Sequence, residues 1–299
     1  MSTFYEAVVV QVGINVLLAL GYWIAVSTGK YSFGHAAFMA LGAYGSSVLT
    51  LNLGWPLPLA LVAGAVVAAI GGALVGWAAL RLTMLYLAII TLVFSELLIT
   101  LISQWDFVGG GSGLVGMTGT SVPLVLGFVA VTVVYLVLLT RSRMGLAYEA
   151  IREDEQAAMG AGIKVTLVSV GAFATSAAVT GVAGGLAAHQ QLIINPDLYG
   201  PQQSLFIILL CVFGGVQYFW GAAVGAIVLS LLPVYFSGLA DWYQVIYGLL
   251  FVVLMILRPQ GLIGSSTSTL VPWRRRRGPA SPDDEPDADA STRQEQTVG

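Results

Sequence analysis

Long apolar stretches alternate with short polar ones along most of this chain of 299 residues. A helix needs roughly 20 mainly apolar residues to cross a bilayer. The pattern predicts nine crossings, at about residues 6–27, 34–52, 57–80, 84–104, 122–140, 165–188, 204–216, 220–236 and 242–257. The seventh is short, so it either crosses or is re-entrant. The predicted fold is an all-α, polytopic transmembrane bundle of about eight or nine spans with glycine-interrupted segments.

Charged residues are scarce and unevenly distributed. They make up 9% of the chain, against about a quarter of a typical soluble domain, and the mean hydropathy is +0.87. Residues 1–264 are predicted to form a transmembrane domain. In residues 265–299 a basic cluster, which can contact anionic lipid, precedes an acidic, proline-rich stretch that is predicted to be disordered. The composition therefore indicates an integral membrane protein with a polar tail.

The basic residues predict an orientation. If the nine spans alternate across the membrane, all 12 Lys and Arg residues fall on one side. Lys and Arg near span ends are retained in the cytoplasm. The N-terminus is therefore expected outside, and the C-terminus with its tail inside.

Two glycine-interrupted segments, residues 29–42 and 214–225, place polar groups and free backbone at membrane depth. Such backbone is tolerated only where it is buried in protein or lines a water-filled path, and a pair of interrupted segments points to a central path. The candidate path residues are Ser32, Gly34, His35, Phe38, Glu96, Gly214 and Gly215.

Two of these side chains have alternative interpretations. His35 is either a hydrogen-bonded structural residue or a path-lining one. Glu96, the only acid well inside a predicted span, is a structural carboxyl, a path residue or a proton relay. His189 is the only other histidine, so no metal site is predicted, and no cofactor is expected.

The sequence predicts no catalytic site. In the glycine-rich loop at residues 106–123, Gly111 and Gly116 have the outer spacing of a P-loop, but Met117 stands where the lysine is needed. Neither the His-Glu-x-x-His nor the Gly-x-Ser-x-Gly pattern is present. We therefore expect a protein that is not an enzyme and does not itself hydrolyse ATP.

The longest polar connection, residues 141–165, is predicted to be cytoplasmic. Residues 147–158 contain helix formers throughout, with Ala147, Ile151 and Ala158 on one face, and glycines end the run. This periodicity predicts a short amphipathic helix, which is either a solvated linker or a docking segment.

The motif IREDEQAAMGAGI (151–163) resembles the cytoplasmic coupling segment of ABC importer permeases. Further matches follow in family order: YSFGHAAFMALGAY, LYLAIITLVFSELL, GGGSGLVGM, NPDLYGPQQSLF, GGVQYFWGAAVGA and RPQGLIG. Together they extend to about residue 264. The chain resembles the permeases of branched-chain amino-acid importers, and the LivM type more than the LivH type.

This resemblance implies a permease subunit of an ATP-driven importer in the plasma (inner) membrane of a bacterium or archaeon, forming the path for branched-chain or related amino acids. It implies as partners a second, LivH-like permease, two ATP-binding subunits, an extracytoplasmic substrate-binding protein and membrane lipid, but no nucleic acid. The implied ATPase-coupling helix contains Arg152, Glu153, Asp154, Glu155, Ala157, Ala158 and Gly162. The alternatives are a urea or short-chain amide permease of the same superfamily and an ion-coupled secondary transporter.

Overall fold

The computed structural model describes residues 2–79, 82, 84–117, 119–235 and 248. Its helices are α1 (Ser2–Val26), α2 (His35–Leu53), α3 (Leu57–Ala79), α4 (Met84–Ser103), α5 (Val122–Arg141), α6 (Arg143–Glu153), α7 (Glu155–Gly160), α8 (Val165–Gln191), α9 (Pro201–Gly214) and α10 (Phe219–Tyr235). Apart from residue 248, the predicted span at 242–257 and the predicted tail at 265–299 lie outside the described residues.

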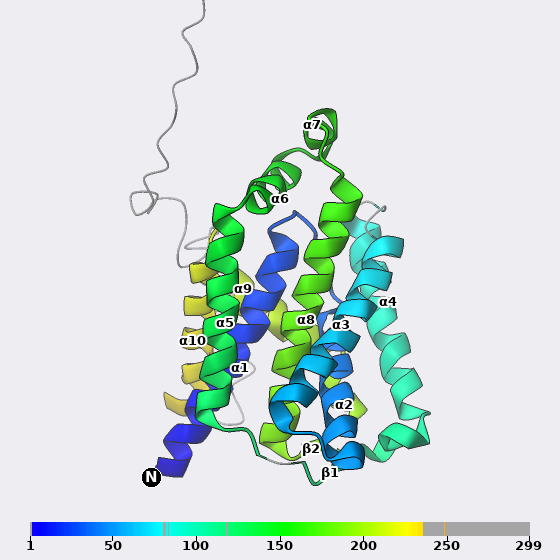
Figure 1. Ribbon diagram of the computed structural model, residues 1–299, viewed down its shortest axis with the longest axis vertical. Helices are drawn as coiled ribbons and strands as arrows, with labels where there is room; N and C mark the ends of the chain where they lie inside the picture. The colour runs from blue at the N-terminus through cyan, green and yellow to red at the C-terminus, as the bar shows by residue number, and fades with distance from the viewer. Residues whose placement is uncertain (1, 80–81, 83, 118, 236–247, 249–299) are drawn as a thin grey trace, which may run out of the picture. The chain divides into compact units, whose positions relative to one another are not determined.

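The described chain is a bundle of helices, as the apolar pattern predicts (Figure 1). Six helices are long and apolar enough to cross a membrane, namely α1, α2, α3, α4, α5 and α8, and they coincide with six predicted spans to within a few residues. The predicted seventh and eighth spans correspond to α9 and α10, which form a pair bent by 116°. Such a pair is either a broken span or a re-entrant loop, so the count of eight or nine spans stays a prediction.

Helix α8 packs against α1, α2 and α3 through small residues (Figure 1). A Cβ atom added at Gly42 of α2 would collide with the backbone of Gly181, and one added at Gly72 of α3 would collide with the side chain of Ala177. In lipid, association depends on such close packing, because the hydrophobic effect does not drive apolar helices together. The small residues of α8 therefore let three other helices approach its backbone.

The second glycine-interrupted segment forms the turn between α9 and α10. Gly215 has a φ of 110°, which favours glycine. A Cβ at Gly214 would collide with the carbonyl of Gly221, and one at Gly225 would collide with the backbone of Gly214. These glycines allow the end of α9 and the beginning of α10 to pack backbone to backbone.

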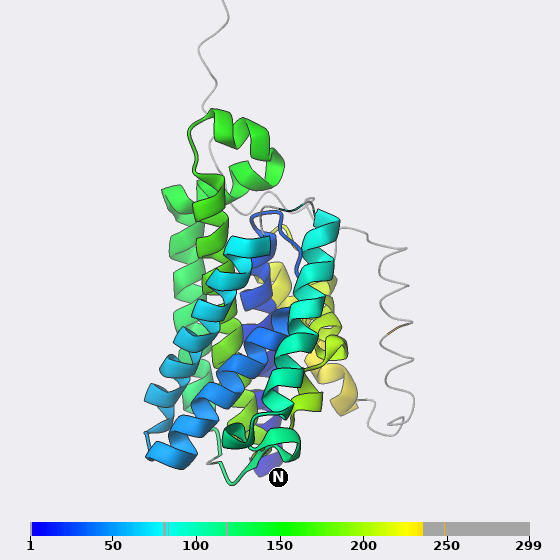
Figure 2. The ribbon, with the colours of Figure 1, turned by 90° about the vertical axis from the view of Figure 1, so that its right-hand side faces the viewer.

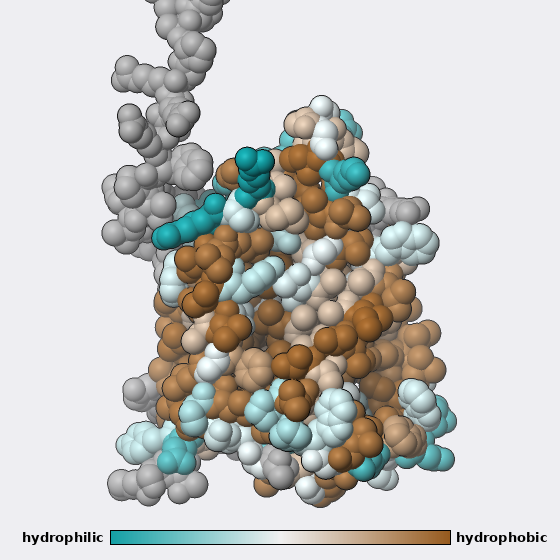
Figure 3. All heavy atoms as spheres, in the orientation of Figure 1, coloured by the Kyte–Doolittle hydropathy of each residue, from teal (hydrophilic) through white to brown (hydrophobic). Residues whose placement is uncertain are grey.

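Charged residues gather at the two ends of the bundle. One end, here called the basic end, carries all the Lys and Arg residues that the structure describes: Lys30, Arg141, Arg143, Arg152 and Lys164. The opposite end, called the acidic end, carries Glu6, Asp106 and Asp197. Between the ends, apolar side chains cover most of the visible surface (Figure 3). The predicted topology requires all Lys and Arg residues to lie on one side of the membrane, and the described ones all lie at one end of the bundle.

The prediction of one continuous amphipathic helix over residues 147–158 is wrong at Asp154. The structure has two helices, α6 and α7, separated by Asp154 in an extended conformation with φ −154° and ψ 108°. The Asp154 carboxylate accepts hydrogen bonds from the backbone N–H groups of Gln156 and Ala157, at 2.8 and 3.0 Å. Aspartate is a better N-cap than interior helix residue, so it ends α6 and begins α7.

The glycine-rich loop folds at the acidic end rather than forming a phosphate cradle. It contains two 3₁₀ turns, η1 (Asp106–Val108) and η2 (Gly110–Ser112), followed by strand β1 (Leu114–Val115). Strand β1 pairs antiparallel with β2 (Ile193–Ile194), and β2 precedes a third 3₁₀ turn, η3 (Pro196–Tyr199). Gly113 has a φ of 75° and lies against the carbonyl of Ile194. Glycine here permits two loops to meet.

We expect Gly42→Ala to destabilise the bundle, because the added methyl group must displace the backbone of α8. Overpacking of this kind typically costs about 1–3 kcal/mol. The matched control is Gly127→Ala on α5, where no atom lies within 4 Å of the added Cβ and alanine favours a helix. Thermal unfolding of the detergent-purified protein measures both effects. Equal melting temperatures for the two variants would contradict this packing.

Candidate functional site

The chain between α1 and α2, residues 27–34, is not helical and folds back beside α1. The ring of His35, the first residue of α2, lies 4.7 Å from the ring of Tyr22 in α1. His35 also contacts Ser176, which lies about three turns into α8. Helix α2 therefore begins inside the bundle, and the segment leading to it is irregular backbone at membrane depth.

Buried hydroxyl groups satisfy this irregular backbone. Three N–H groups around the start of α2 donate to serine or threonine oxygens: Phe33 to Thr91, Gly34 to Ser32 and Ala36 to Ser204, at 3.0, 3.1 and 3.1 Å. Thr91 belongs to α4 and Ser204 to α9. The start of α2 is therefore fixed by hydrogen bonds from two helices that are distant in sequence.

His35 joins three helices at this point. Its Nε2 lies 2.8 Å from the hydroxyl of Ser176 on α8, and that hydroxyl donates to the carbonyl of Gly21 on α1 at 2.6 Å. The rings of Phe38 and Phe173 pack edge-on against the imidazole. His35 is completely buried. Its Nε2 has a hydrogen-bond partner, as the structural interpretation requires, but its Nδ1 has none among the described residues.

The predicted path residues occupy three separate places. Ser32, Gly34, His35 and Phe38 lie together at the buried start of α2, where Gly34 packs against the backbone of Thr91. Glu96 lies on the exposed side of α4. Gly214 and Gly215 lie at the α9–α10 turn. The structure thus brings four of the seven predicted residues together. Among the described residues, no group of three or more His, Cys, Asp or Glu side chains is placed to hold a metal ion.

The predicted coupling residues form α7 and its flanks, which project beyond the long helices at the basic end (Figures 1 and 2). Most are exposed, but Ala158 is only 3% exposed and packs inward with Ile151 of α6. The exposed apolar side chain on α7 is instead Met159, at 54%. The predicted apolar face is therefore an internal contact, and α7 turns a different face outward.

An ion pair connects α7 to the unwound segment before α2. The ammonium group of Lys30 lies 2.8 Å from a carboxylate oxygen of Glu155, and the Lys30 side chain is largely buried. One residue earlier, Gly29 has a φ of 73° and packs against the backbone of Arg152. Sequence reasoning missed this contact because 125 positions separate Lys30 from Glu155. The one feature of the sequence that could have indicated this contact is the position of Lys30 next to a long uncharged stretch.

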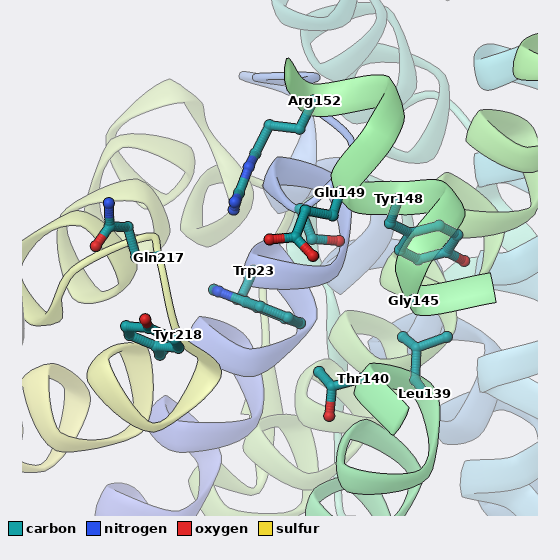
Figure 4. A pocket seen from close by; sticks show the side chains of 10 residues that line it. Trp23, Leu139, Thr140, Gly145, Tyr148, Glu149, Arg152, Gln217 and Tyr218 are labelled. Atoms are coloured by element: carbon teal, nitrogen blue, oxygen red, sulfur yellow. The ribbon is translucent and has the colours of Figure 1, made fainter. Parts of the chain in front are cut away.

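A pocket of about 170 Å³ separates α6 from the α9–α10 turn (Figure 4). Its floor includes Trp23, whose indole N–H donates to the carbonyl of Val216 at 3.0 Å. Tyr148 is buried at its side, and this burial, with a smaller contribution from Tyr135, raises the pKa of Tyr148 to about 12. Side chains from the two facing segments enter the pocket, namely Glu149, Arg152, Gln217 and Tyr218. The polar face of α6 thus faces, across the pocket, the turn that contains Gly214 and Gly215.

Besides having these structural features, the chain matches one known protein family. Residues 4–257 match the permease component of branched-chain amino acid transport systems. The chain belongs to this family. As a permease, it needs its long apolar helices to cross a membrane and its α6–α7 segment to lie outside the apolar region.

Three permeases from Escherichia coli strain K12 are similar to this chain in sequence, to different degrees. The high-affinity branched-chain amino acid permease LivM is 30% identical over 287 residues, which cover 84% of this chain and 68% of LivM. The LivH permease is 26% identical, covering 83% of this chain and 90% of LivH. The D-allose permease AlsC is also 26% identical, covering 71% of this chain and 67% of AlsC. No solved structure matches the chain significantly.

We expect Lys30→Glu and Glu155→Lys each to lower the melting temperature of the purified protein, and the double exchange to restore much of the loss. Glu155 is partly exposed, so the coupling energy should be at most about 1 kcal/mol. The control pair is Arg152 and Glu153, whose charged groups are 3.8 Å apart and where Glu153 is 74% exposed. If exchanging Arg152 and Glu153 restores the melting temperature as much as exchanging Lys30 and Glu155 does, the Lys30–Glu155 ion pair contributes no specific stabilisation.

Proposed function

We propose that this permease pairs with a second permease of the same family to form the path of an ATP-driven importer for branched-chain amino acids. The proposal is supported by its membership of the family and by its likeness to both LivM and LivH, two permeases of one bacterium. It is further supported by the six described helices that are long and apolar enough to cross a membrane.

The basic end of the bundle is proposed to face the cytoplasm of a bacterium or archaeon. Lys and Arg residues flanking membrane helices are retained on that side, and the five that the structure describes all lie at this end. The acidic end, with the loops that β1 and β2 join, then faces outward. An extracytoplasmic binding protein would deliver substrate there.

Two ATP-binding subunits are proposed to dock on the α6–α7 segments of the permease pair. The arrangement of α7 supports this proposal. One face of α7 is exposed, and an ion pair between Glu155 and Lys30 connects the helix to the unwound segment before α2. A partner that moves α7 would thereby pull on residues 29–34. The displacement would be transmitted into the membrane interior at the start of α2, where Ser32, Gly34 and His35 lie.

Substrate identity is the part that family membership supports least, because AlsC, named a D-allose permease, is a relative. We expect vesicles containing the complete importer and its binding protein to accumulate radiolabelled leucine when ATP is present inside. Excess valine or isoleucine should compete, whereas urea, a short-chain amide and D-allose should not. Competition by one of the latter three would reassign the substrate. Uptake that depends on an ion gradient and not on ATP would establish the secondary-transporter alternative.

We expect Met159→Asp to reduce co-purification of the ATP-binding subunits and to abolish uptake, because it places a charge on the proposed docking face. The matched control is Leu198→Asp, since Leu198 is similarly exposed, at 48%, but lies in η3 at the acidic end. That variant should retain the ATP-binding subunits. Ala158→Trp is a poorer test, because Ala158 is buried and a bulky residue there would disturb folding. If the ATP-binding subunits co-purify fully with the Met159→Asp variant, the docking site lies elsewhere.

A further inference from the structure

The side of α4 that faces away from the bundle carries two polar residues among exposed apolar ones such as Ile89, Val93 and Leu97. The opposite side contacts the other helices through Leu87, Thr91, Ser95 and Ile102, which are all buried. Glu96 and Thr100 lie on the exposed side. The Thr100 hydroxyl donates to the backbone carbonyl of Glu96 at 2.9 Å. Among the described residues, no side chain forms a hydrogen bond or ion pair with the Glu96 carboxylate.

Glu96 lies deep within the apolar region rather than at its edge. It is separated from the first residue of α4, Met84, by about 18 Å along the helix axis, and the hydrocarbon core of a bilayer is about 30 Å thick. A carboxylate at that depth is costly when it faces lipid, and such residues usually face a bundle interior or a water-filled cavity.

Helix α3, which packs against α4, and helix α5, elsewhere in the bundle, differ from α4 in having no charged residue between their ends. On α3 the large exposed side chains are all apolar: Leu59, Val62, Val66, Val67, Ile70, Leu74 and Trp77. On α5, between residues 126 and 138, they are Leu126, Val131, Val134, Tyr135 and Leu138. These faces suit lipid. The outward face of α4 is also largely apolar, with Leu85, Ile89 and Val93 exposed. It differs in carrying the charged residue Glu96 among them, although α4 stands at the edge of the bundle (Figure 1).

We propose that the outward face of α4, marked by Glu96 and Thr100, lines the water-filled translocation path and faces the second permease subunit across it. The proposal rests on the proposed function in that it requires an importer with two permeases. Water in the path would solvate the carboxylate, and the second permease would close the other side.

The charges of the described chain favour a different permease over a second copy of this one. A two-fold symmetric pair places the same surface of both copies together, so the two Glu96 carboxylates would share one face at membrane depth. Like charges there repel, and the described Lys and Arg residues all lie at the basic end, too far to compensate. A homologous but distinct permease, as LivH is to LivM in Escherichia coli, can present hydrogen-bond donors to this acidic face.

Site-directed cysteine labelling tests the proposal directly. The chain has one cysteine, Cys211, which is buried and is replaced by alanine to give the background. Thr100→Cys is compared with Ile70→Cys on α3 and Val131→Cys on α5, both on exposed apolar faces. Each variant is expressed with the complete importer in membranes and treated with a charged, membrane-impermeant methanethiosulfonate. In parallel, each cysteine carries a benzophenone maleimide, which is photolysed beside an epitope-tagged second permease.

We expect Thr100→Cys to react at least about tenfold faster than both controls, because a thiol in lipid neither ionises readily nor meets a charged reagent. Its photoproduct should contain the tagged second permease. Reaction as slow as that of the controls would overturn the proposal, since α4 would then face lipid. Crosslinking to a second copy of this chain alone would overturn the assignment of the partner.

Wild-type leucine uptake and co-purification of the two permeases are measured in the same membranes. If uptake fails while the labelling pattern holds, the proposed substrate is wrong and the path assignment stands. If uptake and pairing are normal while Thr100→Cys is unreactive, only the inference about α4 fails.

Discussion

Backbone N–H groups that lie at membrane depth must find their partners inside the protein, because lipid offers none. The segment before α2 shows what this constraint demands. Its N–H groups donate to hydroxyls of Thr91 on α4 and of Ser32. The first turn of α2 adds a hydrogen bond from the Ala36 N–H to a hydroxyl of α9, and His35 uses a hydroxyl from α8. If any of these helices shifted, a buried donor would lose its acceptor, at a typical cost of about 1–3 kcal/mol. The unwound start of α2 therefore fixes the relative positions of helices that are distant in sequence.

Close packing of small residues makes this arrangement possible. Helix α8 approaches α2 so tightly at Gly42 and Gly181 that a methyl group does not fit, yet Gly127 and Gly171 have open space around them. In the sequence these glycines look alike. Which glycine is a contact and which is only a weak helix former depends on the neighbour that the fold supplies.

The same segment links the membrane interior to the polar end of the bundle. Residues 29–34 contact α6 and α7 on one side and hold the start of α2 on the other. The break at Asp154 contributes, because it separates α7 from α6 and allows Glu155 to meet Lys30. A single continuous helix, as the residue pattern predicted, would point its following residues in another direction. The capping preference of aspartate was readable in the sequence, but the run of helix formers around it outweighed that signal.

The sequence by itself determined the helical class, the approximate bounds of six membrane-length helices, the polar segment between α5 and α8, and the family resemblance. These features depend on local composition and on motifs that are contiguous in the chain. It also grouped Ser32, Gly34, His35 and Phe38, because these residues are neighbours along one segment. Only the tertiary structure decided that Glu96 faces away from that group, that Ala158 is buried and that Lys30 pairs with Glu155. The physical reason is that hydrophobic periodicity gives the face of a helix but not the neighbour of that face, which depends on how all the helices pack together.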